Sequence, residues 1–283
     1  MFLAKEPMQN NAPRFVFFGT PDFAVTVLDG LMAGGMMPVA IVTNPDRPIG
    51  RKKELTPPPV KRRFKIQDSR FKILQPEKLN DAFIVALKKL GAEVGVLAAY
   101  GKIVPRAVFE VFPKGIVVVH PSLLPKYRGA TPIQFAILAG EKITGTTLFI
   151  MDEKVDHGPT VASTSVSITD SDTYITLAQK LAEASSRLLV DTLSEYLSGA
   201  CVPQAQREHG ATYTKKFLNE NGLINVKEDA PEKIWRMVRA LNPEPGVWCM
   251  EGGRRKKILA AEIVDGKLIV RKFQFEGELP RIH

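Results

Sequence analysis

Cysteine is scarce in this chain of 283 residues, which contains only Cys201 and Cys249. The two lie far apart, and neither belongs to a paired metal-binding or redox motif. This excludes a disulfide framework and a cysteine-based metal centre. We therefore expect reduced, structural thiols in a reducing compartment, and no metal site.

Long apolar runs are absent as well. No stretch approaches the ~20 consecutive apolar residues that a membrane-spanning helix needs. The first thirteen residues, Met1 to Pro13, contain Lys5 and Glu6 and no continuous apolar core, so they lack the anatomy of a secretory signal. We expect residues 1–13 to be a disordered arm on a soluble, cytoplasmic, monomeric protein that does not use a membrane.

Glycine is missing where a dinucleotide-binding loop requires it. The first apolar run ends at Gly19, but Thr-Pro-Asp follows in place of the second and third glycines of that loop. A Walker-type phosphate loop and an internal repeat are also absent. The sequence therefore argues against NAD binding and against a P-loop enzyme.

Acidic residues are too few to balance the basic ones. Asp and Glu number 30 against 39 Lys and Arg, which gives a net charge of +9 and favours an anionic partner such as nucleic acid, a phosphorylated substrate or a polyanionic cofactor. Residues 44–63 are rich in proline and basic side chains. They predict an unpacked loop that contacts phosphates, with a solvated flexible loop as the alternative.

Apolar strand patterns alternate with helical patterns over the first 198 residues. The predicted strands are 14–19, 39–43, 71–74, 94–98, 116–119 and 145–151. The predicted helices follow Thr20 and occupy 77–90, 131–139 and 173–197. This alternation predicts an α/β domain over residues 14–198 with a doubly wound, mainly parallel, Rossmann-like sheet.

The pattern changes after this domain. Residues 199–210 are typical of a linker, and residues 211–283 predict a small, OB-like β-barrel with one helix at 229–241. Within it, the strand patterns 256–264 and 267–271 flank Asp265-Gly266, a strong hairpin signal. Because the chain ends soon after Gly277, we expect a shortened barrel.

A candidate site follows the strand pattern at 116–119. Its β-branched residues lead into His120, after which prolines forbid regular structure, and ligands of open parallel sheets collect where strands end. Val118 shares the face of His120, because side chains alternate along a strand. A carboxylate of a second loop, residues 151–159, could orient the imidazole for proton transfer. A histidine that only satisfies a strand end is the alternative.

Seven segments spread along nearly the whole chain resemble the methionyl-tRNA formyltransferase family. They are Gly19–Phe23, Asn44–Arg51, Leu55–Lys61, Ala99–Lys102, His120–Gly129, Asp156–Pro159 and Arg239–Gly246. The His-Pro-Ser-Leu-Leu-Pro element alone indicates the wider formyltetrahydrofolate-dependent superfamily. The basic loop and the Ala-Leu-Asn-Pro segment narrow the resemblance to the tRNA enzymes.

The resemblance implies formyl transfer from 10-formyltetrahydrofolate to the α-amino group of methionine on initiator tRNA. His120 then matches the catalytic histidine and Asp156 the carboxylate that orients it. Expected folate contacts are Ala98, Ala99, Tyr100, Gly101, Ser122, Leu123, Leu124, Pro125, Asp152, His157 and Gly158. Arg51 matches an arginine used on the acceptor end of the tRNA. With it, the expected tRNA contacts are Arg47, Lys52, Lys53, Arg254, Arg255 and Lys256.

One position departs from the family pattern. The family places an asparagine two residues before the histidine to stabilise the oxyanion, and here that position is Val118, which donates no hydrogen bond. Three explanations stay open: the chain is a mutant, another group replaces the asparagine as the oxyanion donor, or the protein binds its substrates but turns them over poorly. Two other functions stay open: a sugar-nucleotide N-formyltransferase, and a catalytically impaired protein that binds tRNA or folate.

Overall fold

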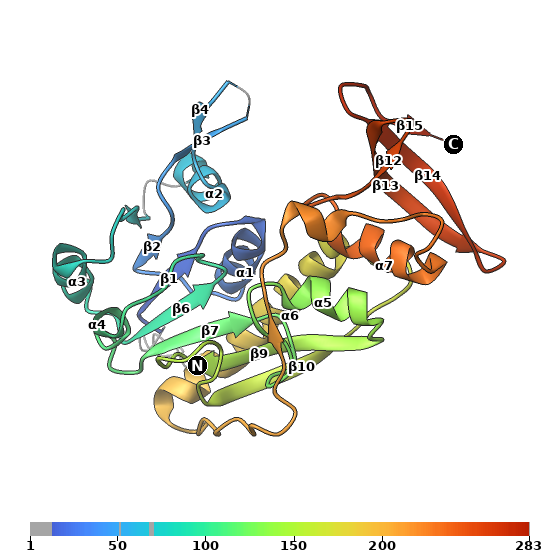
Figure 1. Cartoon of the computed structure of the whole chain (residues 1–283). Helices are drawn as coiled ribbons and strands as arrows, with labels where there is room; N and C mark the ends of the chain where they lie inside the picture. Colours follow the sequence, from blue (N-terminus) through green and yellow to red (C-terminus); the bar gives the residue numbers. More distant parts are fainter. Residues whose placement is uncertain (1–12, 51, 68–70, 283) are drawn as a thin grey trace, which may run out of the picture. The chain divides into compact units, whose positions relative to one another are not determined.

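A computed structural model describes residues 13–50, 52–67 and 71–282 (Figure 1). The predicted N-terminal arm lies outside the described residues except for Pro13. The chain divides into two compact units. The first comprises the residues up to Val119 together with Ser186–Pro203, and the second comprises His120–Ser185 and the residues from Gln204 on.

The first unit is built on parallel strands in the order β7-β6-β1-β2-β5. These strands are β1 (Phe15–Gly19), β2 (Ala40–Val42), β5 (Ile73–Leu74), β6 (Val94–Ala98) and β7 (Ile116–His120). Every residue of β1, β6 and β7 is buried, as expected for continuous apolar strands of a parallel sheet. The strand order reverses between β1 and β6, which makes their carboxyl ends a topological switch point. The predicted α/β fold with a mainly parallel sheet is confirmed.

Helices connect these strands. They are α1 (Asp22–Ala33), α2 (Pro59–Gln67), α3 (Asp81–Lys88) and α4 (Arg106–Phe109), and α6 (Tyr174–Ser198) belongs to both units. The apolar residues Ala24, Val27, Leu28 and Leu31 are buried on α1 because their spacing places them on one helical face. The side chain of Asn80 caps α3 by accepting a hydrogen bond from the Phe83 nitrogen at 3.2 Å.

The prediction that residues 44–63 are unpacked is wrong. β3 (Arg47–Ile49) and β4 (Glu54–Thr56) form an antiparallel hairpin, and α2 follows. Pro59 opens α2, where a missing N–H costs nothing, and Val60 and Phe64 are buried one helical turn apart. The many prolines and charged residues of this segment made the short apolar stripe of α2 hard to recognise in the sequence. Arg51 lies outside the described residues.

The second unit contains an antiparallel pair, β9 (Ile143–Ile150) and β10 (Thr160–Ser167), and the helix α5 (Pro132–Ala139). The sequence did not predict β10, because its exposed positions all carry Ser and its apolar content is low. A short parallel pair joins β8 (Arg128–Gly129) to β11 (Tyr213–Thr214). This pair places the loop after His120 against a segment far along the chain.

The last part of the second unit combines a helix with an antiparallel sheet. Its elements are the 3-10 turn η1 (Asn219–Gly222), α7 (Pro231–Leu241), β12 (Val247–Glu251), β13 (Arg254–Val264), β14 (Lys267–Phe275) and β15 (Arg281–Ile282). The predicted hairpin is confirmed, since Asp265 and Gly266 both adopt the left-handed conformation of a tight hairpin turn. In the part of the chain that is described, β12 and β15 form the sheet edges and do not pair with each other.

Candidate active site

The imidazole of His120 is held at both ring nitrogens at the end of β7. The side chain is buried, with 5% of the residue exposed. Nε2 lies 2.9 Å from the carbonyl oxygen of Tyr127, and because a carbonyl only accepts, Nε2 carries a proton in this geometry. Nδ1 lies 3.5 Å from Oδ2 of Asp156. The predicted pairing of His120 with Asp156 is therefore present in the structure.

The two residues that face the ring nitrogens of His120 have unusual backbones. Tyr127 has φ 61° and Asp156 has φ 46°, in the left-handed region that non-glycine residues rarely adopt. Such conformations cost on the order of 1–3 kcal/mol each and persist only where the surroundings impose them. Oδ2 of Asp156 also accepts a hydrogen bond from the Gly129 nitrogen at 2.7 Å. The carboxylate is thus fixed before any substrate arrives.

The His120–Asp156 pair can accept a proton from a reacting group. Nδ1 of His120 can take up a proton beside Asp156, and the carboxylate then stabilises the imidazolium. The bond to Tyr127 keeps the ring from rotating away. The arrangement fits a reaction in which an attacking group loses a proton.

A second group of charged side chains adjoins the Asp156 loop. Nδ1 of His157 lies 2.6 Å from Oδ2 of Asp152, and its Nε2 lies 3.2 Å from Oε1 of Glu208. Glu208 also pairs with Arg128, whose side chain is completely buried. Burial alone would lower the pKa of Arg128, but hydrogen bonds with Glu208 and Tyr213 outweigh it and raise that pKa, so the guanidinium stays charged.

The sequence did not single out Arg128, Gln206 or Glu208 as site residues. Arg128 stands in the quoted His120–Gly129 segment, which was the only signal for it. Gln206 and Glu208 fall in the predicted linker. Nothing in local periodicity marks them, because their partners lie 78 and 80 residues away.

The expected folate contacts belong to both units. Ala98–Gly101 follow β6 at the switch point of the first unit, where the Tyr100 carbonyl accepts hydrogen bonds from Oγ1 of Thr20 at 2.9 Å and Nδ2 of Asn44 at 3.0 Å. Burial raises the pKa of Tyr100 to about 12. The remaining contacts, in residues 122–125 and 152–158, belong to the second unit.

The expected tRNA contacts form two groups, again one in each unit. Arg47 lies in β3 with 61% of its side chain exposed and pairs with Glu77 at 2.7 Å, and the exposed Lys52 and Lys53 follow it. In the second unit, Arg255 stacks over the Trp248 ring at 4.1 Å and Lys256 binds Glu251 at 2.9 Å.

Arg254 begins β13 beside these two residues. It stacks over the Phe275 ring at 4.7 Å and pairs with Glu278. The basic residues at the start of β13 are therefore ordered by aromatic contacts and by acidic partners.

Comparison with known proteins identifies the family. The family model for formyl transferase matches residues 13–193, and the model for the formyl transferase C-terminal domain matches residues 216–277. This chain belongs to the formyl transferase family. The predicted resemblance and enzyme class are confirmed.

Named relatives agree with this family. The methionyl-tRNA formyltransferase of Halorhodospira halophila is 43% identical over 256 residues, which is 90% of this chain and 82% of the relative. Among solved structures, methionyl-tRNA formyltransferase from Clostridium thermocellum has TM-score 0.63 at 19% identity and covers 93% of this chain and 98% of its own. HypX from Aquifex aeolicus, solved with tetrahydrofolic acid, has TM-score 0.66 at 14% identity. The match covers 95% of this chain and 46% of the HypX chain. At these identities the two structures support the fold.

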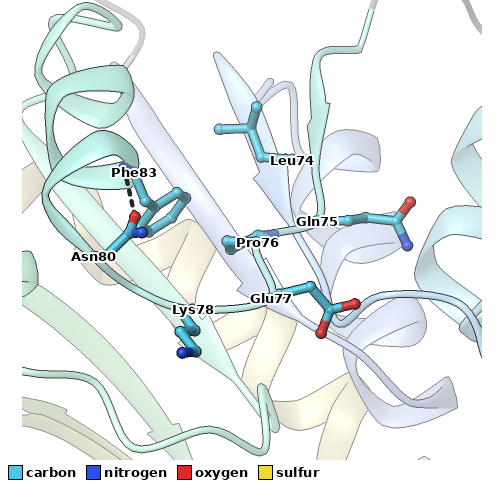
Figure 2. A pocket seen from close by; sticks show the side chains of 7 residues that line it. All are labelled: Leu74, Gln75, Pro76, Glu77, Lys78, Asn80 and Phe83. Carbon is cyan, nitrogen blue, oxygen red and sulfur yellow. Dashed lines mark hydrogen bonds between the residues drawn. The ribbon is translucent and has the colours of Figure 1, made fainter.

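Two clefts of this formyltransferase are lined by residues other than the predicted catalytic ones. One, of about 500 Å³, opens between β5 and α3 of the first unit (Figure 2), and it is lined by Leu74, Gln75, Pro76, Glu77, Lys78, Asn80 and Phe83. The other, of about 1070 Å³, lies between α7 and the β13-β14 pair. Neither is lined by His120, Asp156 or an expected folate contact.

Two further findings hold for the described residues. No group of three or more His, Cys, Asp or Glu side chains among them is arranged to hold a metal ion. No helix among them combines the length and the apolar composition needed to cross a membrane.

Substituting Gly158→Ala is expected to reduce formyl transfer by about 100-fold, because small misplacements of a catalytic group have effects of that size. An added Cβ would lie 1.8 Å from the Ile150 carbonyl oxygen, so the loop that carries Asp156 must move. Single-turnover kinetics would measure the loss. The control is Gly199→Ala, whose Cβ meets nothing within 4 Å but whose φ of 83° strains a side chain, so it reports the effect of backbone strain away from Asp156. An unchanged rate in Gly158→Ala would contradict the inference that the close approach of Gly158 to the Ile150 carbonyl positions Asp156.

Proposed function

We propose that this protein transfers the formyl group of 10-formyltetrahydrofolate to the α-amino group of methionyl initiator tRNA, for translation initiation. The observation that carries the proposal is the 43% identity to a methionyl-tRNA formyltransferase across 90% of the chain. It is supported by the His120–Asp156 pair and by the basic residues of both units.

In this proposal His120 and Asp156 are the catalytic residues. When bound, 10-formyltetrahydrofolate would supply the formyl group and leave as tetrahydrofolate, whose N10 would gain the proton that the amine loses. His120 takes the proton of the attacking amine at Nδ1, and Asp156 stabilises the charge that the ring acquires. Tyr127 holds Nε2 at 2.9 Å and so fixes the plane of the ring. Val118 lies two residues earlier on β7 and donates no hydrogen bond to the formyl oxygen.

The residues around Ala98–Gly101 fit a folate. Oδ1 of Asn44 is buried and has no hydrogen-bond partner within the described residues, while the amide nitrogen of the same side chain binds the Tyr100 carbonyl. A pterin presents N–H donors on a flat ring, which suit such an acceptor beside a turning backbone. We propose that Ala98, Ala99, Tyr100 and Gly101 bind the folate. The contacts from the second unit are Ser122, Leu123, Leu124, Pro125, Asp152, His157 and Gly158.

We further propose that different segments of the chain have different roles. Residues 14–198 catalyse the transfer, residues 199–210 link the two domains, and residues 211–283 bind tRNA. The proposed tRNA contacts are Arg254, Arg255 and Lys256 of the last segment and Arg47, Arg51, Lys52 and Lys53 of the first. The two family matches support boundaries near these positions. We also propose that the protein acts as a cytoplasmic monomer and needs neither a membrane nor a metal.

The direct test is an assay with methionyl initiator tRNA and 10-formyltetrahydrofolate. We expect formylmethionyl-tRNA as the product. Formylation of a nucleotide-linked amino sugar with no reaction on the tRNA would replace this proposal with the sugar enzyme. Salt-dependent tRNA binding without transfer at long times would replace it with a binding protein.

Arg51→Ala is expected to raise KM for the tRNA more at low salt than at moderate salt, because the loss of one phosphate contact removes an electrostatic attraction that moderate salt already screens and so makes binding less salt-dependent. KM for the tRNA would be measured at several salt concentrations. Arg106→Ala is the matched control, since Arg106 is exposed in α4 and pairs with Glu110 at 2.6 Å. A changed KM for the folate in Arg51→Ala would contradict the assignment.

A further inference from the structure

The segment 204–214, part of which was predicted to be a linker, binds directly to the loop after His120. We call this segment the strap. It begins at Gln204, whose backbone exchanges hydrogen bonds with Thr160 at 2.7 and 2.8 Å. Further along, Thr212 accepts hydrogen bonds from the nitrogens of Tyr127 and Arg128, both at 2.8 Å. The strap therefore supports the unusual backbone of Tyr127, the residue that holds Nε2 of His120.

Gln206 makes the corresponding contact with the Asp156 loop. Its amide nitrogen donates to the carbonyl oxygens of Asp156 at 3.0 Å and of Gly158 at 2.8 Å. Its amide oxygen accepts from Nε and Nη2 of Arg128 at 3.1 and 2.8 Å. Two carbonyls require a donor and a guanidinium requires an acceptor, so a side-chain amide satisfies all four contacts, whereas a carboxylate satisfies only those with Arg128.

Arg128 gives these contacts their rigidity. Its side chain is fully buried, and Glu208 of the strap binds it at 3.1 and 3.2 Å. The buried charge is thus neutralised within the strap, and the guanidinium fork presents fixed donors to Gln206. Movement of the amide would break bonds to a charged group that has no access to water.

We propose that Gln206 is a positioning residue that acts through Asp156. It holds the Asp156 backbone at φ 46°, so that Oδ2 stays on the Gly129 nitrogen and beside Nδ1 of His120. The kinetic part of this inference rests on the proposed function, whereas the structural part does not. The strap thereby orients the two groups that face the ring nitrogens of His120, Tyr127 through Thr212 and Asp156 through Gln206.

The test is Gln206→Glu in the full-length protein. The new carboxylate keeps the contacts with Arg128 but faces two carbonyl oxygens that it cannot satisfy, so the Asp156 loop should shift while the fold remains. We expect kcat to fall about 10- to 100-fold, as for other supporting residues of catalytic groups, with KM for the tRNA unchanged. Gln206→Met, which has similar length and no donor, should give the same split between kcat and KM.

Amide hydrogen exchange of Gly129, measured by NMR, provides a readout without turnover. The Gly129 nitrogen donates to Asp156, so its exchange should quicken in Gln206→Glu while exchange in β13 and β14 stays the same. The matched control is Gln204→Glu, because Gln204 lies on the same strap with an exposed side chain and binds Thr160 through its backbone. It should leave both kcat and Gly129 exchange unchanged.

The outcomes separate the two proposals. Unchanged Gly129 exchange in Gln206→Glu, or an equal effect in Gln204→Glu, would overturn the positioning role. Unchanged kcat despite faster exchange would also overturn it, because the Asp156 loop would then not need its position. If the wild-type protein transfers no formyl group, the proposed function fails, and Gly129 exchange still decides whether Gln206 holds the loop.

Discussion

Val118→Asn is expected to raise the single-turnover rate of formyl transfer by about 100- to 1,000-fold, the factor that removal of one oxyanion donor typically costs. Val118 precedes His120 by two residues on β7, so the two side chains leave the strand on the same face. An asparagine amide at this position would offer the hydrogen-bond donor that valine lacks. The gain should appear in kcat, because the donor acts when negative charge develops on the formyl oxygen.

The same substitution should lower stability. Val118 is 5% exposed and pairs with Leu97 in the register of β6 and β7. An amide buried there without substrate costs about 1–3 kcal/mol, which thermal unfolding would detect. Val118→Leu is the matched control, because leucine is similar in size to asparagine and has no donor. A rate for Val118→Asn that does not exceed that of Val118→Leu would contradict a role for the missing donor.

His120→Gln is expected to reduce the single-turnover rate by about 100- to 10,000-fold, the range for loss of a general acid–base group. Glutamine can still donate to the Tyr127 carbonyl, but it cannot take up a proton beside Asp156. The fold should therefore persist while proton transfer fails. Asp156→Asn should also slow the reaction, because an amide does not stabilise an imidazolium as a carboxylate does.

The control for His120→Gln is His209→Gln. His209 is exposed on the strap, and the same substitution there should leave the rate unchanged. Thermal unfolding of each variant checks that the fold is intact. If His120→Gln retains the wild-type rate, His120 is not the proton acceptor and the proposed mechanism is wrong.

Local patterns predicted the elements that depend on neighbouring residues. The apolar run 116–119 indicated β7 because a buried parallel strand is apolar on both faces, and Asp265-Gly266 indicated a hairpin because its turn needs two left-handed residues. The same reasoning failed for residues 44–63. There the prolines and charges led to the prediction of an unpacked loop, although Val60 and Phe64 are buried one turn apart on α2.

The sequence by itself determined the fold class, the family resemblance and the place of His120 at the end of its strand, and the resemblance implied Asp156 as its partner. Only the tertiary structure decided how that pair is held. Tyr127 accepts from Nε2 through a backbone carbonyl, which carries no signal in residue type. Gln206 reaches the Asp156 loop from 50 residues away. Such bonds form only where folding brings distant segments of the chain together, and the local spacing of residue types in the sequence does not predict which segments meet.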